Sequence, residues 1–197
     1  AACMGMLVDQ GKISWDDPVI NHLPGFKLYD PFVTREIRIR DLFLHNSGVG
    51  NADYLWANNN LSSDEIVSRL QLIKPAYSFR AGFIYQNIFY LVAGQIIEKV
   101  SGMPWSAFIT KNIFTPLGMN HTRPLLSLVT DVNITRPHYL IDSTIQPIDH
   151  ESADAVGAAG SVLSSIDDIS LWLECMLDRT KYAGGRLVKP AAWKELL

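Results

Sequence analysis

Apolar residues recur at helical spacing in several parts of the chain and predict a mostly helical fold. Near the N-terminus they occupy positions 3, 4, 7 and 8, and Gly11 follows where such a helix is expected to end. The longest apolar run predicts a helix from Asn87 to Val100, with Asn87 as its N-cap and Ser101-Gly102 as its end. Because this helix is apolar on nearly all sides, we expect it to be buried.

The remaining elements are shorter and are separated by turn residues. Ser62 with Glu65 forms a capping box that predicts a helix closed by Pro75. Ser165 with Asp168 predicts the cap of a later helix. We further expect a short strand at 37–40, loops at 49–61 and 120–157 with one short hairpin in the second, a helix at 105–113 ended by Pro116-Leu117-Gly118, and a last helix at 190–197.

The composition is that of a globular protein. Among 197 residues, 48% are hydrophobic and 19% are charged, and the net charge is −3 with the basic residues dispersed. This distribution provides no surface for nucleic acid, and no stretch is long and apolar enough to be a membrane-spanning segment. The two cysteines, Cys3 and Cys175, are far apart in the sequence and are expected to be buried apolar residues.

Both ends of the sequence lack the usual signals of a domain boundary. The first apolar face follows Ala1 without a methionine or a capping residue, and the last helix has no stop signal before Leu197. We therefore expect residues 1–197 to form a single partial domain, truncated at both ends. No targeting signal can be identified in these residues.

Several common catalytic motifs are absent from the sequence. No serine has glycine both two residues before and two residues after it, and neither glycine-rich phosphate-binding motif occurs. The five histidines never fall four residues apart, so no helical metal pair is expected. Ser47 and Ser161 have no lysine or histidine at an activating spacing. We expect no nucleophile in this chain, no metal ion and no cofactor.

Five phrases occur in an order that resembles the serine β-lactamase-like family. Tyr85-Gln86-Asn87 is similar to its Y-x-N motif, and the stretch from Leu44 to Gly48 is similar to its L-x-H-x-S-G phrase. The other three are the opening stretch 7–12 with the turn 15–18, the I-x-x-P-L-G-M phrase at 113–119, and the small-residue segment 159–165 followed by Asp168. Because the phrases span nearly the whole chain, it resembles class C β-lactamases and penicillin-binding esterases.

The resemblance implies a catalytic role for Tyr85 and a substrate-binding role for Asn87. The family uses S-x-x-K, a middle Y-x-N, and a final K-T-G or H-x-G motif, and it forms an acyl-enzyme on the serine. Tyr85 would transfer the serine's proton, and Asn87 would bind a substrate amide. No lysine here has serine three residues before it or glycine two residues after it. By the family's spacing, the serine is expected about seven residues before Ala1 and the final motif beyond Leu197.

The family fold is an antiparallel sheet with helices on both sides and a helical subdomain. Because most strands would lie outside residues 1–197, we expect an α-rich α+β fragment, inactive by itself, from the middle of a serine hydrolase. The expected substrates are small esters, amides or β-lactams. Two departures from the family pattern, Gln86 where β-lactamases often have Ser or Ala and Arg80-Ala81-Gly82 where many relatives have Pro-Gly, speak against a β-lactam and leave esterase and peptidase activity equally open. The resemblance suggests a periplasmic or secreted protein. Residues 3–8 would lack their sheet strands, so self-association through exposed apolar surface is expected.

Other interpretations follow from the same residues. The chain could be a non-catalytic pseudoenzyme or binding module, or a structural helical domain whose phrases match the family by chance. Tyr85 could be an ordinary core tyrosine, and Asn87 only a helix cap. The resemblance places the phrase of His45 in a structural turn, so we expect a packing histidine rather than a general base.

Overall fold

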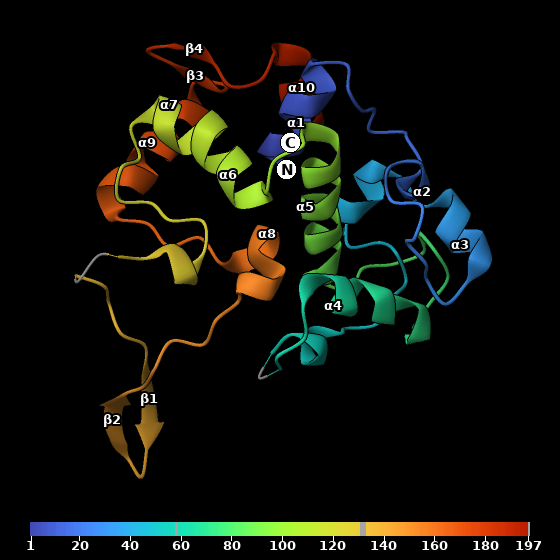
Figure 1. The fold of residues 1–197 in the computed structure, drawn as a ribbon, viewed down its shortest axis with the longest axis horizontal. Coiled ribbons are helices and arrows are strands. Elements are labelled where there is room, and N and C mark those ends of the chain that lie inside the picture. Colours follow the sequence, from blue (N-terminus) through green and yellow to red (C-terminus); the bar gives the residue numbers. More distant parts are fainter. Residues whose placement is uncertain (58, 131–132, 197) are drawn as a thin grey trace.

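The computed structural model describes residues 1–57, 59–130 and 133–196. Asn58 of the first expected loop, Asp131 and Val132 of the second, and Leu197 of the last expected helix lie outside them. Helices dominate the molecule, and α5 runs through its middle (Figure 1). The α-helices are α1 (Ala2–Asp9), α2 (Val19–His22), α3 (Pro31–Glu36), α4 (Ser63–Arg69), α5 (Ile88–Ser101), α6 (Trp105–Ile109), α7 (Thr115–Leu117), α8 (Gly157–Gly160), α9 (Ile166–Leu177) and α10 (Pro190–Glu195).

The β-structure of the described residues consists of two antiparallel hairpins. They are β1 (His138–Ile141) with β2 (Thr144–Pro147), and β3 (Lys181–Tyr182) with β4 (Gly185–Arg186). The first is the hairpin predicted within 120–157, and it projects away from the helical body (Figure 1). Short 3₁₀-helices at Ile39–Phe43, Asp53–Leu55, Leu70–Leu72, Leu126–Leu128 and Asp154–Val156, and a π-helical turn at Thr110–Phe114, connect the larger elements. None of the described helices has the length and apolar character needed to cross a membrane.

Helix α5 lies in the centre of the core, as its apolar composition predicts. Phe89 and Ile96 are almost fully buried, and Gly102 ends the helix with a φ of +72°. Helix α8 packs so closely at Gly94 that a Cβ atom there would lie 2.8 Å from the Cβ of Ala158. The predicted range, 87–100, agrees with the observed range Ile88–Ser101 to within one residue at each end.

Helix α1 packs against both α5 and α10, and this packing buries its apolar face. Cys3, Met4 and Leu7 are buried, and a Cβ atom on Gly5 would lie 3.3 Å from Leu196 Cδ1. The expectation that residues 3–8 would expose an apolar face is wrong, because neighbouring helices cover it.

Exposed apolar side chains gather instead on α9 and on the β1–β2 hairpin. Ile166, Leu173 and Leu177 recur at helical spacing along α9, and all three are exposed. The Ser165 side chain caps this helix, as predicted, by accepting the Asp168 N–H at 3.2 Å. If the chain associates with itself, this face offers more apolar surface than α1 does.

Residues 37–40 do not form the predicted strand. Only an isolated bridge between Pro18 and Arg38 is present, and a 3₁₀-helix begins at Ile39. Ile37 and Arg38 are extended, but the Asp41 carboxylate accepts the Arg38 N–H at 2.9 Å, which closes a turn and ends the extended stretch after two residues. The alternation of apolar residues correctly indicated that Ile37 and Ile39 point into the core.

The helix predicted to end at residue 113 continues along a helical path to Leu117. Pro116 does not stop it, because it lies in the first turn of α7, where the missing N–H of proline is tolerated. Gly118 ends the helix with a φ of +75°. The Pro116-Leu117-Gly118 segment thus ends the helix, as predicted, but the residue responsible is Gly118 and not Pro116.

Candidate active site

The Tyr85-Gln86-Asn87 segment leads directly into α5, and its three side chains have different environments. Tyr85 is 54% exposed, Gln86 is fully buried, and Asn87 is half-buried. The buried residue anchors the segment in the core while its two neighbours stay near the surface. This arrangement suits a motif that presents Tyr85 and Asn87 to another molecule.

Gln86, the residue before the N-cap Asn87, supplies the side-chain acceptor at the start of α5. Its Oε1 accepts the Ile88 N–H at 3.3 Å, and its Nε2 donates to the Gly50 carbonyl at 2.8 Å. Asn87 occupies the N-cap position, as predicted, but it already has helical dihedral angles and its side chain makes no capping hydrogen bond. Neither the spacing nor the composition of the sequence indicated that Gln86 would have this role.

The side chain of Asn87 is held by a carboxylate that the sequence analysis did not identify. Its Nδ2 donates to Asp53 Oδ1 at 3.1 Å, and the same carboxylate accepts from Trp56 Nε1 at 2.9 Å and Asn51 Nδ2 at 3.1 Å. Burial alone would raise the pKa of the Asp53 carboxyl, but these hydrogen bonds outweigh it and lower the pKa. Because a carboxylate only accepts, the amide nitrogen of Asn87 must face Asp53.

Backbone hydrogen bonds join the 45–50 turn to the loop that precedes the motif. The His45, Asn46 and Gly48 carbonyls accept the N–H groups of Ile84, Arg80 and Ala76 at 3.0, 2.8 and 2.8 Å. Gly48 has a φ of +82°, and a Cβ atom there would overlap the Tyr77 carbonyl oxygen. The glycine of the H-x-S-G phrase is therefore required for the close approach of the two loops.

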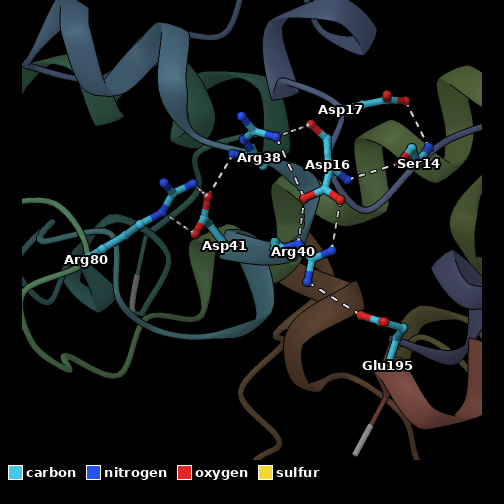
Figure 2. A network of polar contacts seen from close by, with 8 residues as sticks. All are labelled: Ser14, Asp16, Asp17, Arg38, Arg40, Asp41, Arg80 and Glu195. Atoms are coloured by element: carbon cyan, nitrogen blue, oxygen red, sulfur yellow. Dashed lines mark hydrogen bonds and ion pairs between the residues drawn. The ribbon is translucent and has the colours of Figure 1, made fainter.

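An ion pair with a buried carboxylate fixes the same loop to the 3₁₀-helix at 39–43. Arg80 donates from Nε and Nη2 to the two oxygens of Asp41 at 2.9 and 2.7 Å (Figure 2). The Asp41 side chain is only 2% exposed and also accepts the Arg38 N–H. Arg80 thus anchors the loop through its side chain.

The ring of His45 lies within an aromatic cluster at the motif. Its centroid is 4.7 Å from that of Tyr85, 5.4 Å from Phe83 and 5.7 Å from Tyr90. Its Nδ1 accepts the Gln86 N–H at 3.2 Å. Burial lowers the pKa of His45, which favours the neutral imidazole. The prediction of a packing histidine agrees with these contacts.

The two serines that were considered as nucleophiles are buried and have structural hydrogen bonds. Ser47 Oγ accepts the Val49 N–H at 3.2 Å. Ser161 Oγ donates to the Pro124 and Gly157 carbonyls. Within the described ranges, no group of acidic, cysteine or histidine side chains is arranged to hold a metal ion.

A separate groove lies away from the motif. Its volume is about 790 Å³, and His121, Leu163 and Asp167 are among its lining residues. Neither Tyr85 nor Asn87 lines this groove, so it is separate from the Y-x-N segment.

The chain is similar to known proteins of one family. The Beta-lactamase family model matches residues 1–196. The chain is 25% identical over 198 residues to the unguisins hydrolase of Aspergillus violaceofuscus (strain CBS 115571), which covers 90% of this chain and 34% of that protein. It is 26% identical over 206 residues to the N-acetylmuramyl-L-alanine amidase of Bacillus subtilis (strain 168), with 89% of this chain and 46% of that protein covered.

The fold also matches a solved member of this group. The octameric penicillin-binding protein homologue from Pyrococcus abyssi superposes with a TM-score of 0.81 at 25% identity, over 98% of this chain and 45% of that one. The chain thus spans between a third and a half of the length of these relatives. The interpretation that the motif phrases arose by chance is wrong: the chain belongs to the Beta-lactamase family, whose members include penicillin-binding proteins and related serine hydrolases.

Proposed function

We propose that this chain supplies the middle catalytic motif of a serine hydrolase that is acylated on serine and hydrolyses an ester, amide or β-lactam. Tyr85 transfers the proton of the serine, and Asn87 binds the substrate. The observation that carries the proposal is the arrangement at the start of α5. There, buried Gln86 anchors the segment while exposed Tyr85 and half-buried Asn87 are each held by a neighbouring loop.

The chemistry of the two side chains fits these roles. A phenol hydroxyl both donates and accepts hydrogen bonds, so Tyr85 can relay a proton: its oxygen accepts the serine proton as its own proton passes to the leaving group. The amide of Asn87 offers donor and acceptor atoms to a substrate amide. The amidase among the relatives supports an amide substrate. The serine and lysine of the S-x-x-K motif, which these 197 residues do not contain, complete the proposed site.

The test is to join this chain to family segments that carry S-x-x-K and the final K-T-G or H-x-G motif, and to measure acylation. Tyr85→Phe removes one oxygen from an exposed side chain, so the melting temperature should not change. Acylation should fall by about 10²-fold, the scale of a lost proton-transfer group. If Tyr85→Phe is acylated at the normal rate, Tyr85 has no catalytic role.

Asn87→Ala should act mainly on substrate binding. It also removes the hydrogen bond to Asp53, so its effect on the melting temperature must be measured beside its effect on the acylation rate. A matched control is Asn51→Ala, which removes another donor to the same carboxylate but lies outside the motif. Equal effects of the two variants on acylation would contradict a substrate-binding role for Asn87.

The chain by itself should not form an acyl-enzyme, because none of its serines precedes a lysine by three residues. Incubation with nitrocefin, p-nitrophenyl esters or a fluorophosphonate probe should therefore give no reaction above background. Stoichiometric covalent labelling would refute this expectation. If the extended protein binds β-lactams or peptides without being acylated, the protein is a non-catalytic binding module of the same fold.

A further inference from the structure

His45 holds the segment that carries Tyr85 at three points. Its backbone carbonyl accepts the Ile84 N–H at 3.0 Å, before Tyr85 in the chain, and its Nδ1 accepts the Gln86 N–H at 3.2 Å, after Tyr85. The ring of His45 also packs against the phenol ring, with centroids 4.7 Å apart and planes inclined by 37°. One residue thus restrains the backbone on both sides of Tyr85 and its side chain.

The hydrogen bond to Gln86 defines the state of the imidazole. Nδ1 can accept the Gln86 N–H only when it carries no proton, so the proton of the neutral ring must be on Nε2. The lowered pKa of His45, caused by burial, keeps the ring neutral near pH 7. The Nδ1 atom is therefore already engaged by the backbone and is not available as a general base.

His45 is itself fixed in place by other elements. Its φ is +55°, and the Tyr77 hydroxyl donates to its carbonyl at 3.4 Å. Tyr90 in the first turn of α5 stacks on the imidazole with centroids 5.7 Å apart, and Phe43 packs edge-on against Tyr90 at 5.3 Å. The position of the ring is thus determined by the core helix and by the turn at 45–48.

We propose that His45 is a positioning residue for Tyr85: it accepts the Gln86 N–H and packs against the phenol ring, and so keeps the Tyr85 hydroxyl where the serine proton is transferred. This inference rests on the proposed catalytic role of Tyr85. A displacement of about 1 Å can lower an enzymatic rate by about 10²-fold. Loss of the His45 contacts should therefore slow acylation without preventing substrate binding.

Two substitutions separate the contacts of His45. His45→Phe keeps an aromatic ring but removes the Nδ1 acceptor. His45→Asn removes the ring but places an oxygen near the position of Nδ1, and asparagine tolerates a positive φ. In the protein extended with the flanking motifs, His45→Phe should lower the maximal acylation rate by about tenfold or more with little change in substrate affinity. His45→Asn, which keeps an acceptor for the Gln86 N–H but loses the ring contact, should be acylated faster than His45→Phe and more slowly than the unmodified protein, while His150→Phe, at an exposed position, should have no effect.

A double-mutant cycle distinguishes this inference from the proposed function. If His45 acts through Tyr85, the double variant His45→Phe/Tyr85→Phe should be no slower than Tyr85→Phe alone. Normal acylation by Tyr85→Phe would overturn the proposed function itself. If Tyr85→Phe is slow, then normal acylation by His45→Phe, or losses that multiply in the double variant, would overturn only the role of His45.

A measurement without any substitution keeps the inference testable if His45→Phe does not fold. Nitrogen-15 NMR of the imidazole near pH 7 should show an unprotonated Nδ1 and a protonated Nε2 for His45. The exposed His150 should show the averaged signals of a ring in exchange with water. A protonated Nδ1 on His45 would exclude the hydrogen bond from Gln86 and overturn the inference.

Discussion

Removing Arg80 should destabilise the protein more than removing Arg40, although both guanidinium groups form the same kind of ion pair. Arg80 donates to Asp41 at 2.9 and 2.7 Å, and Arg40 donates to Asp16 at 2.9 and 3.1 Å through the same two atoms (Figure 2). The carboxylates differ in burial, since the side chain of Asp41 is 2% exposed and that of Asp16 is 58% exposed. The two pairs therefore form a natural comparison of a buried with an exposed carboxylate.

The difference in stability between the two variants depends on how the carboxylate that remains in each is solvated. Arg80→Ala leaves the Asp41 carboxylate, within the described part of the chain, with the Arg38 N–H as its donor. Removing one partner of a fully buried pair costs about 3–5 kcal/mol. Because the Arg80 side chain is 43% exposed, water can replace part of the guanidinium, and we expect about 1.5–3 kcal/mol. Arg40→Ala leaves the exposed Asp16 to water and to Arg38 Nη1 at 3.7 Å, and also removes a contact to Glu195 at 3.5 Å, so it should cost at most about 1 kcal/mol.

Urea unfolding followed by circular dichroism measures this difference. Arg80→Ala should shift the midpoint to lower urea at an unchanged slope, and the slope multiplied by the shift gives the loss of stability. Arg80→Gly is a second variant that removes the same ion pair. Because Arg80 has a φ of +61°, which glycine adopts without strain, Arg80→Gly should lose less stability than Arg80→Ala. If Arg40→Ala costs as much as Arg80→Ala, burial of the carboxylate does not determine the strength of these pairs.

Three further predictions concern other parts of the molecule. Gly48→Ala should cost about 2 kcal/mol or more in urea unfolding, because of its positive φ and the overlap with the Tyr77 carbonyl, whereas Gly50→Ala, whose Cβ would meet open space, should be nearly neutral. Burial raises the pKa of the Cys3 thiol to about 11, so iodoacetamide at pH 8 should label Cys3 only after unfolding, and rapid labelling of the folded protein would contradict its burial. Burial lowers the pKa of His45, so stability should fall as the pH drops below about 6.5 towards the folded-state pKa, where the unfolded chain binds the proton more readily. His45→Asn should lack this part of the pH dependence, and equal slopes for the two proteins would refute the assignment to His45.

The sequence by itself determined the elements that depend on residues a few positions apart. The apolar run predicted α5 to within one residue, and the capping box of Ser62 and Glu65 is present as predicted. The glycine at the end of α5 and the hairpin within 120–157 also follow from local residue types. The ordered phrases identified the family. The catalytic role of Tyr85 and the substrate-binding role of Asn87 stay predictions. The helix, its ends and the hairpin depend on hydrogen bonds and steric preferences within about one helical turn.

Only the tertiary structure decided how the motif is held. Asp41 and Arg80 are 39 residues apart, and Asp53 and Asn87 are 34 residues apart, so no local spacing indicates that they meet. The side-chain acceptor at the start of α5 belongs to Gln86 and not to the N-cap Asn87, because the Gly50 carbonyl orients Gln86 once the two loops pack together. Helix α1 is buried for the same reason, since its partners α5 and α10 are distant in the chain. Such contacts form when the chain folds back on itself, and the free energy that selects them comes from packing and from the burial of polar groups with their partners.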